Sequence, residues 1–448
     1  MNIYLEICRD YNQQTIDRII LGWSHLFADK IKPGQKIVIK PNWLAHSHKY
    51  DENEWLPVIT HPTVITAVLK GVLKYLRGSG EVTITDGPQT DSSWRKIMQR
   101  MTPDLWVEMG KKAGVPVKIL DLREDEWINK NDVTIERKKL PGDPLGSTEV
   151  DLDGFSEFIG HKPSPKGYYG ADYDKEETNR AHSNGHHLYR VSRTVMEADV
   201  FINLPKLKTH KKAGITCSLK NLVGINTYKN YLPHHNEGTP DIGGDQFPEP
   251  SVKNKAESIA IEKFKQILKN HNELGKLFIP VKRLGKKVFG DTRETIRSGN
   301  WWGNDTLWRM VLDLNKILLY ANPDGSLRED KIENQKKYIS IVDGIIAGEG
   351  NGPEAPDPFP AGMLIAGTNP VAVDAVCAKI MGFDWQKIPS IKNAYNIQHY
   401  PLCDFQYEDI QVISKDSRFN KRLVDISTSD VFRFKPHFGW VNHVELDT

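Results

Sequence analysis

The first 125 residues alternate between short apolar runs and longer amphipathic stretches. An apolar run of four to six residues between turn formers predicts a buried strand, whereas apolar residues three and four apart predict a helix. Strand–helix–strand spacing of this kind is typical of a parallel sheet. The predicted elements are strands at Lys36–Lys40, Glu81–Thr85 and Val117–Leu120, and a helix at Val64–Arg77 opened by His61-Pro62-Thr63 with Thr60 as its N-cap.

The regular pattern is lost between residues 125 and 191, which are rich in Gly, Pro, His, Asp and Lys. Loops of this length are usually functional, so we expect a long surface insertion with a hairpin in it. Regular patterning then returns. The later predicted elements are strands at Val200–Leu204 and Asp409–Ser414, helices at Val252–Asn272 and Leu307–Leu319, and a strand–loop–strand–helix unit at residues 338–382.

These elements together predict an α/β fold with a mainly parallel, doubly wound sheet. The length of 448 residues is enough for more than one domain. We expect two α/β lobes, residues 1–250 with the insertion at about 125–191, and residues 251–448. The alternative is that the two lobes interleave into one unit.

Composition narrows the class of protein. Apolar residues make up 39% of the chain and charged residues 26%, and the formal net charge is only +2. This balance gives no reason to expect a nucleic-acid partner. We expect no transmembrane segment, because no apolar run approaches 18 residues, and the first ten residues do not resemble a signal peptide, so we expect a soluble cytoplasmic protein. Four dispersed cysteines exclude a Cys-rich iron–sulfur motif. The oligomeric state stays open.

Polar residues follow four of the predicted strands. Ligands of parallel α/β sheets bind beyond the carboxyl ends of the strands, so these residues are candidates for one cleft. Ordinary turn chemistry is the alternative, because Asp-Gly and Pro-Asn also form turns. The residues in question are Lys40 and Asn42, Asp86, the group Lys206, Lys208 and His210, and Asp343 with Glu349 in the following Gly-rich loop.

The segment 205–221, PKLKTHKKAGITCSLKN, contains five lysines among small residues. Lysines this close repel one another unless they are solvated or face an anion. Lys208 and Lys220 are therefore candidates for neutralising a phosphate or carboxylate, with Thr216, Ser218 and Asn221 as further polar ligands. His210 is a candidate general acid or base, with a structural histidine as the alternative.

Two further clusters each have a functional and a structural interpretation. His234 and His235 stand next to Pro233 in a turn-rich stretch, which suits a metal ligand or an acid–base role, and a pair of surface histidines is the alternative. Trp301 and Trp302 lie close to amide and carboxylate side chains, an arrangement typical of sugar binding and also of a domain-interface core.

Several ordered blocks resemble the bacterial and archaeal family called domain of unknown function 362. They include Lys40-Pro41-Asn42, Asp86-Gly87, the run VFINLPKLKTH, and Ser218-Leu219-Lys220-Asn221, and they continue to IVDGIIAGEGNGP and IAGTNPVAVDAVCAKIMG. The blocks span roughly residues 36–390. Many relatives carry an added Cys-rich ferredoxin segment, which has no counterpart here, so no iron–sulfur cluster is expected.

A shorter segment, residues 197–225, is similar to the nickel-pincer lactate racemases. The resemblance implies a catalytic histidine at His210, a cofactor-holding lysine at Lys220, and a nickel-binding histidine at His234 or His235. The chain departs from the racemase pattern in having Ser218-Leu219-Lys220 where the racemases have Gly-Arg-Lys, and Lys40-Pro41-Asn42 where they have a His-rich loop.

The leading hypothesis is an enzyme that acts on an anionic small molecule, a hydroxy acid or a sugar or sugar phosphate, by acid–base or metal-assisted chemistry. The catalytic candidates are His210, Lys208, Lys220 and Asp86, and the cofactor, if any, would be a divalent or transition metal. The alternative is a non-catalytic protein that binds a sugar or a polyanion.

Overall fold

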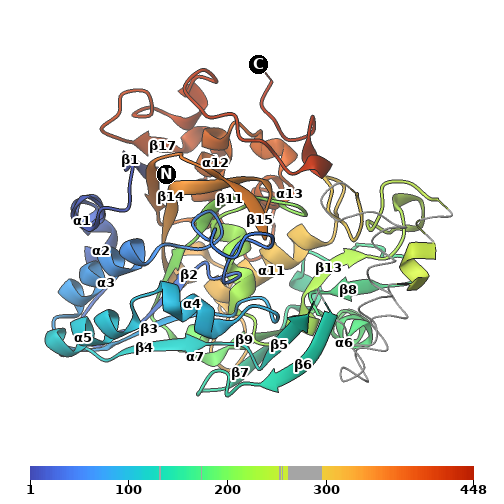
Figure 1. Ribbon diagram of the computed structural model, residues 1–448, viewed down its shortest axis with the longest axis horizontal. Coiled ribbons are helices and arrows are strands. Elements are labelled where there is room, and N and C mark those ends of the chain that lie inside the picture. Colours follow the sequence, from blue (N-terminus) through green and yellow to red (C-terminus); the bar gives the residue numbers. More distant parts are fainter. Residues whose placement is uncertain (131–132, 173, 252–253, 255, 261–294, 448) are drawn as a thin grey trace.

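The computed structural model describes residues 1–130, 133–172, 174–251, 254, 256–260 and 295–447. One large mixed sheet forms its centre (Figure 1). The strands of this sheet are β1 (Asn2–Ile7), β2 (Lys36–Pro41), β3 (Glu81–Asp86), β4 (Val117–Asp121), β10 (Val200–Leu204), β11 (Lys206–His210), β12 (Gly214–Thr216), β14 (Lys337–Asn351), β15 (Ala355–Phe359), β16 (Met363–Gly367) and β17 (Gln411–Ile413).

The strand order is β17-β1-β16-β14-β10-β2-β3-β4. The run β14-β10-β2-β3-β4 is parallel throughout, and β16 is antiparallel to both of its neighbours. Strands from both the early and the late part of the chain therefore share one sheet.

Helices cover both faces of the sheet, as a doubly wound fold requires. One face packs on the early helices and the other on the later ones (Figure 1). The helices are α1 (Gln13–Gly22), α2 (Ser24–Ala28), α3 (Pro62–Leu76), α4 (Trp94–Arg100), α5 (Pro103–Ala113), α6 (Lys175–Ala181), α7 (Arg193–Glu197), α8 (Ser218–Asn221), α11 (Leu307–Tyr320), α12 (Pro370–Met381) and α13 (Pro389–Ala394).

Strand β10 shows why the sheet is buried on both faces. Val200, Ile202 and Leu204 point into the core under the early helices, and Phe201 points into the core under the later ones. Alternate strand residues face opposite sides, so a continuous apolar run is the expected signature of such a strand.

The α/β fold with a mainly parallel sheet is confirmed, and each predicted strand and the helices at 64–77 and 307–319 correspond to observed elements. One detail is wrong: His61, not Thr60, is the N-cap of α3, because the His61 ring accepts the amide N–H of Thr63. The Thr60 hydroxyl instead donates to the Leu204 carbonyl. The helix predicted at Val252–Asn272 lies largely outside the described residues.

The insertion at residues 125–191 contains more regular structure than its sequence suggested. Three two-stranded sheets use strands from this region: β5 (Asp125–Lys130) with β6 (Val133–Lys139), β7 (Ser147–Asp151) with β9 (Leu188–Ser192), and β8 (Tyr168–Gly170) with β13 (Pro233–Asn236). The predicted hairpin corresponds to β5–β6. Within the described residues, no helix is long and apolar enough to cross a membrane.

Candidate functional site

A cavity of about 340 Å³ lies beyond the carboxyl ends of β2, β3 and β10, where ligands of such sheets bind. Strand β11, helix α8, the β8–β13 pair and the start of the insertion complete its walls. Ten of the residues singled out from the sequence line it: Lys40, Asn42, Asp86, Lys208, His210, Thr216, Lys220, Asn221, His234 and His235.

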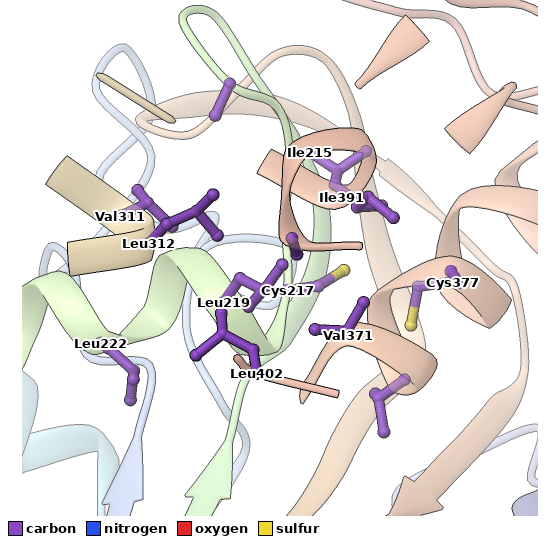
Figure 2. Packing of buried hydrophobic residues seen from close by; sticks show 14 of the residues in the cluster. Ile215, Cys217, Leu219, Leu222, Val311, Leu312, Val371, Cys377, Ile391 and Leu402 are labelled. Carbon is purple, nitrogen blue, oxygen red and sulfur yellow. The ribbon is translucent and has the colours of Figure 1, made fainter. Parts of the chain in front are cut away.

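Helix α8 carries Lys220 and Asn221 to the cavity and is held in place from behind. The buried Asp374 carboxylate accepts the backbone N–H groups of Ser218 and Leu219 at 2.6 and 3.0 Å, and so caps the start of the helix. Burial raises the pKa of Asp374 to about 7. The apolar side chains of α8 and its surroundings pack against α11 and α12, as Figure 2 shows for Leu219 and Val371.

The floor of the cavity is an ion pair between Lys40 and Asp86, whose Nζ and Oδ1 atoms are 2.8 Å apart. Asp86 also accepts the backbone N–H groups of Trp43 and Gly87, so its hydrogen-bonding capacity is largely used inside the protein. Gly224 packs directly on this pair: a Cβ atom there would lie 1.9 Å from Asp86 Oδ1 and 2.8 Å from Lys40 Nζ. The pair therefore requires glycine at 224.

A line of amide side chains orients Lys208. The Lys208 ammonium donates to Asn42 Oδ1 at 3.0 Å and to the Val58 carbonyl, and Asn42 in turn donates to Asn221 at 2.7 Å. Asn221 then donates to Asn203 at 2.7 Å. Lys208 has no carboxylate partner within the described residues, and its burial, next to Lys206 and Lys220, lowers its pKa well below the ordinary value.

Lys220 is the half-buried cation of this site that has no protein partner. Its amino group makes no hydrogen bond or ion pair with any residue that the structure describes. Burial, together with the neighbouring charges of Lys229, Lys40 and Lys211, lowers the pKa of Lys220 to about 7. Near neutral pH this amine can therefore exist both as an anion-binding cation and as a free base.

The two imidazoles in the cavity have opposite hydrogen-bonding roles. His210 Nδ1 accepts the backbone N–H groups of Lys212 and Ala213 at 3.0 and 3.1 Å, so the ring proton must be on Nε2. His234 Nδ1 faces the Leu232 carbonyl at 2.9 Å and must donate to it, which leaves Nε2 with a lone pair. His210 thus offers the cavity a donor and His234 an acceptor.

Both rings are held in the neutral form. Burial lowers the pKa of His210 and of His234 well below the ordinary value, and the surrounding lysines, Lys220 among them, lower each further. A neutral imidazole with a free Nε2 lone pair, as in His234, is the form that acts as a base or binds a metal.

His235 does not share the position of His234, because neighbouring strand residues point to opposite sides. Its ring stacks on Tyr169 with 4.9 Å between centroids and lies 3.3 Å from the Lys212 amino group. The described residues contain no group of three or more His, Cys, Asp or Glu side chains placed to hold a metal ion. The described residues therefore do not by themselves provide a complete set of protein ligands for a metal ion.

Lys206 and Asp343 lie outside the cavity, contrary to the expectation of one cleft at all the strand ends. They form an ion pair with each other at 2.9 Å, and both side chains are fully buried. The Tyr11 hydroxyl accepts from the Lys206 ammonium at 2.8 Å and donates to the Asp343 carboxylate at 3.0 Å. Strand β11 is irregular between Lys206 and Lys208, and the two lysines have entirely different partners.

Four other expected binding residues also lie away from the cavity. Ser218 is buried with its hydroxyl 2.8 Å from that of Ser340. Glu349 lies in the β14–β15 hairpin, and its carboxylate accepts the backbone N–H of Lys435. Trp301 is buried with its indole N–H on the Asp245 carbonyl, and Trp302 is exposed and stacks on His443.

The sequence did not single out several residues that line the cavity, among them Asp172, Lys229 and Glu354. Glu354 directly follows the Gly-rich loop after β14 and binds Lys211 at 2.8 Å, so its place at a strand end was a usable signal. Asp172 lies in the insertion, where no hydrophobic periodicity placed it.

One protein-family model matches most of this chain. The model of a family described as "Domain of unknown function (DUF362)" matches residues 37–148 and 160–379. A thylakoid-associated protein of Synechocystis sp. is 26% identical over 202 residues, which cover 45% of this chain. The chain spans 38% of the length of that relative.

Two solved structures are also similar. A Thermotoga maritima protein aligns with 78% of this chain and 56% of its own, at 12% identity and a TM-score of 0.30. The lactate racemase apoprotein from Thermoanaerobacterium thermosaccharolyticum aligns with 76% of this chain and 50% of its own, at 11% identity and a TM-score of 0.31.

Proposed function

This chain belongs to the family of domain of unknown function 362, and from that premise we propose that it is an enzyme acting on an anionic small molecule by acid–base chemistry. One observation carries the proposal. Within a single cavity, the unpartnered Lys220 amino group lies with two neutral imidazoles, His210 and His234, of opposite hydrogen-bonding polarity.

Lys220 and Lys208 would neutralise a carboxylate or phosphate of the substrate. The buried Thr216 hydroxyl supports this role, because it lines the cavity and has no hydrogen-bond partner among the described residues. A buried polar group without a partner is costly, so a ligand oxygen at this position would relieve the cost.

His234 would accept a proton through its Nε2 lone pair, and His210 would donate a hydrogen bond through Nε2–H to an oxygen where negative charge develops. Asp86 would serve as the fixed counter-charge of Lys40 at the floor of the cavity. The substrate class remains a hydroxy acid or a sugar or sugar phosphate. We derive no step through a metal, because the described residues do not provide a set of ligands for one.

Deuterium wash-in tests the proposal. The protein would be incubated in D₂O with hydroxy acids and sugar phosphates, and with a cell extract, and each compound examined by mass spectrometry for deuterium and for consumption. We expect incorporation with the unchanged protein, and loss of it in His234→Ala and Lys220→Met.

The alternative of a sugar-binding protein without catalysis gives a different result. A sugar would raise the melting temperature while no compound exchanged deuterium or was consumed. Of the residues that motivated this alternative, the tryptophans lie outside the cavity and the lysines Lys208 and Lys220 line it.

A further inference from the structure

The part of the cavity formed by the insertion differs in chemistry from the lysine-rich part. Trp127, Asn129 and Asp172 of the insertion line it together with Thr90 and Asp91, whereas Lys208 and Lys220 line the part next to α8. Hydroxyl and amide groups, an indole and carboxylates in one wall are typical of sites that bind hydroxyl groups.

Asp172 is the residue that makes this wall unusual. The residue is only 8% exposed, and among the described residues it accepts one side-chain hydrogen bond, from the Thr90 hydroxyl to Oδ1 at 2.8 Å. Within the described residues, Oδ2 has no hydrogen-bond partner and the carboxylate is in no ion pair. Oδ2 is open to the cavity, so a ligand hydroxyl can donate to it there in place of water.

The donor should be a neutral hydroxyl and not an ammonium group. The positive charge of Lys229 acts on Asp172, and the Lys229 amino group is already bound to the Gly87 and Asn226 carbonyls. The surroundings of Asp172 are of mixed charge, with Lys229 and Arg137 positive and Asp91 negative, and a neutral hydroxyl can donate to the carboxylate without adding a further charge.

The cavity also has room for more than a three-carbon acid. Thr90, Trp127, Asp172 and Lys229 line a second cavity of about 190 Å³ as well as the first, so the two adjoin at Asp172. Ligand sites of a few hundred Å³ hold molecules that are much larger than a three-carbon acid.

We propose that Asp172 binds a hydroxyl group of the substrate, and that the substrate is a polyhydroxylated anion, a sugar acid or sugar phosphate, with its charged end at Lys220. This inference rests on the proposed function and narrows its substrate class. Its chemistry is hydrogen bonding alone, and Asp172 oriented by Thr90 would set the position of the chain of hydroxyls.

Paired probes test the inference by calorimetry. Gluconate is compared with hexanoate, and glucitol phosphate with hexyl phosphate, so that each pair differs only in its hydroxyl groups. We expect the polyol of each pair to bind roughly tenfold tighter or more, as one hydrogen bond to a carboxylate would give. Asp172→Asn and Asp172→Ala should lose this preference while the alkyl anions bind unchanged.

Asp143→Asn is the matched control. Asp143 is another buried carboxylate, bound to Ser192 and Thr194 away from the cavity, and its loss should leave the preference intact. Equal binding of both members of each pair, with weakening of both in Lys220→Met, would overturn the inference and keep the proposed function. If none of the four anions binds, both the inference and the proposed function are refuted.

Discussion

Lys206 and Asp343 form a fully buried ion pair, 2.9 Å from Nζ to Oδ2, outside the cavity that Lys208 lines two residues further along β11. Lys206 and Lys208 belong to one short sequence motif, yet one is bound to a carboxylate and the other to an amide and a carbonyl. The motif therefore serves stability at one position and the candidate site at the other.

Lys206→Met should destabilise the protein by about 3–5 kcal/mol, because it leaves the Asp343 carboxylate buried and unpaired. Urea unfolding measures this loss. Lys36→Met is the control: it removes an exposed pair with Glu197 and should cost at most about 1 kcal/mol. A loss of similar size in both variants would contradict a structural role specific to Lys206.

Lys220→Met should abolish binding of inorganic phosphate or of small carboxylates while the protein stays folded. The pKa of Lys220 is lowered to about 7, so its positive charge is lost as the pH rises through that value. In the unchanged protein, anion affinity should therefore fall between about pH 6 and 8, and calorimetry across this range should show no such step in the variant. A lowered melting temperature with normal anion affinity would instead indicate a structural lysine.

The tautomers of His210 and His234 can be observed without any substrate. Nitrogen-detected NMR of the side chains should show the proton on Nε2 in His210 and on Nδ1 in His234. Neither ring should titrate between about pH 5 and 8, because burial and nearby lysines lower both pKa values. Exposed His186, whose pKa Asp151 raises, is the internal control that should titrate. The same tautomer in both rings would refute the assignment of donor and acceptor.

Gly224→Ala should disrupt the floor of the cavity. The added Cβ would overlap Asp86 Oδ1, so we expect a loss of about 1–3 kcal/mol in stability and weaker anion binding. Gly154→Ala is a matched control, because a Cβ at that position meets no atom within 4 Å and the backbone has an ordinary φ. Chemical unfolding measures the stability of both variants, and calorimetry measures their anion affinity. Equal stability and equal affinity in the two variants would show that the close packing at Gly224 is not needed.

Two buried histidines in the insertion should make the protein sensitive to acid. Burial lowers the pKa of His182 to about 3 and of His187 to about 4. The unfolded chain takes up these protons below about pH 6.5 and the folded chain only near pH 3 to 4, so their contribution to stability is present above pH 6.5 and falls as the pH drops towards 4. The difference in unfolding free energy between the protein and His182→Asn/His187→Asn should shrink over this window. A difference that does not change with pH would contradict the buried, neutral state.

The sequence predicted the layers of the fold because the pattern that identifies a buried parallel strand is local. Val200–Leu204 and Glu81–Thr85 are apolar runs bounded by turn residues, and each forms a strand of the sheet. The N-cap of α3 could not be chosen in the same way. Thr60 and His61 can both cap a helix, and the choice depends on the Leu204 carbonyl, which is distant in sequence and takes up the Thr60 hydroxyl.

Part of the site was predictable from strand ends and part from clusters of lysine and histidine. Lys40 and Asp86 meet as the ends of two neighbouring parallel strands should, whereas Lys220 and His234 were predicted from the composition of their segments. Asp343 also ends such a pattern, but β14 continues to Asn351 as one long strand, so Asp343 lies in its middle and faces Lys206. Asp172 could not be found, because the pairing of β8 with β13 that brings it to the cavity joins two segments without periodicity.

The place of β1 in the sheet has a consequence for folding during synthesis. This strand precedes its two neighbours by a long stretch of sequence, since β16 lies at residues 363–367 and β17 at residues 411–413. On the ribosome, both edges of β1 must therefore wait for hydrogen-bond partners until those later residues have emerged. An unpaired strand edge is prone to pair with other chains, so recombinant production should gain from slow translation and from chaperones that shield the nascent β1.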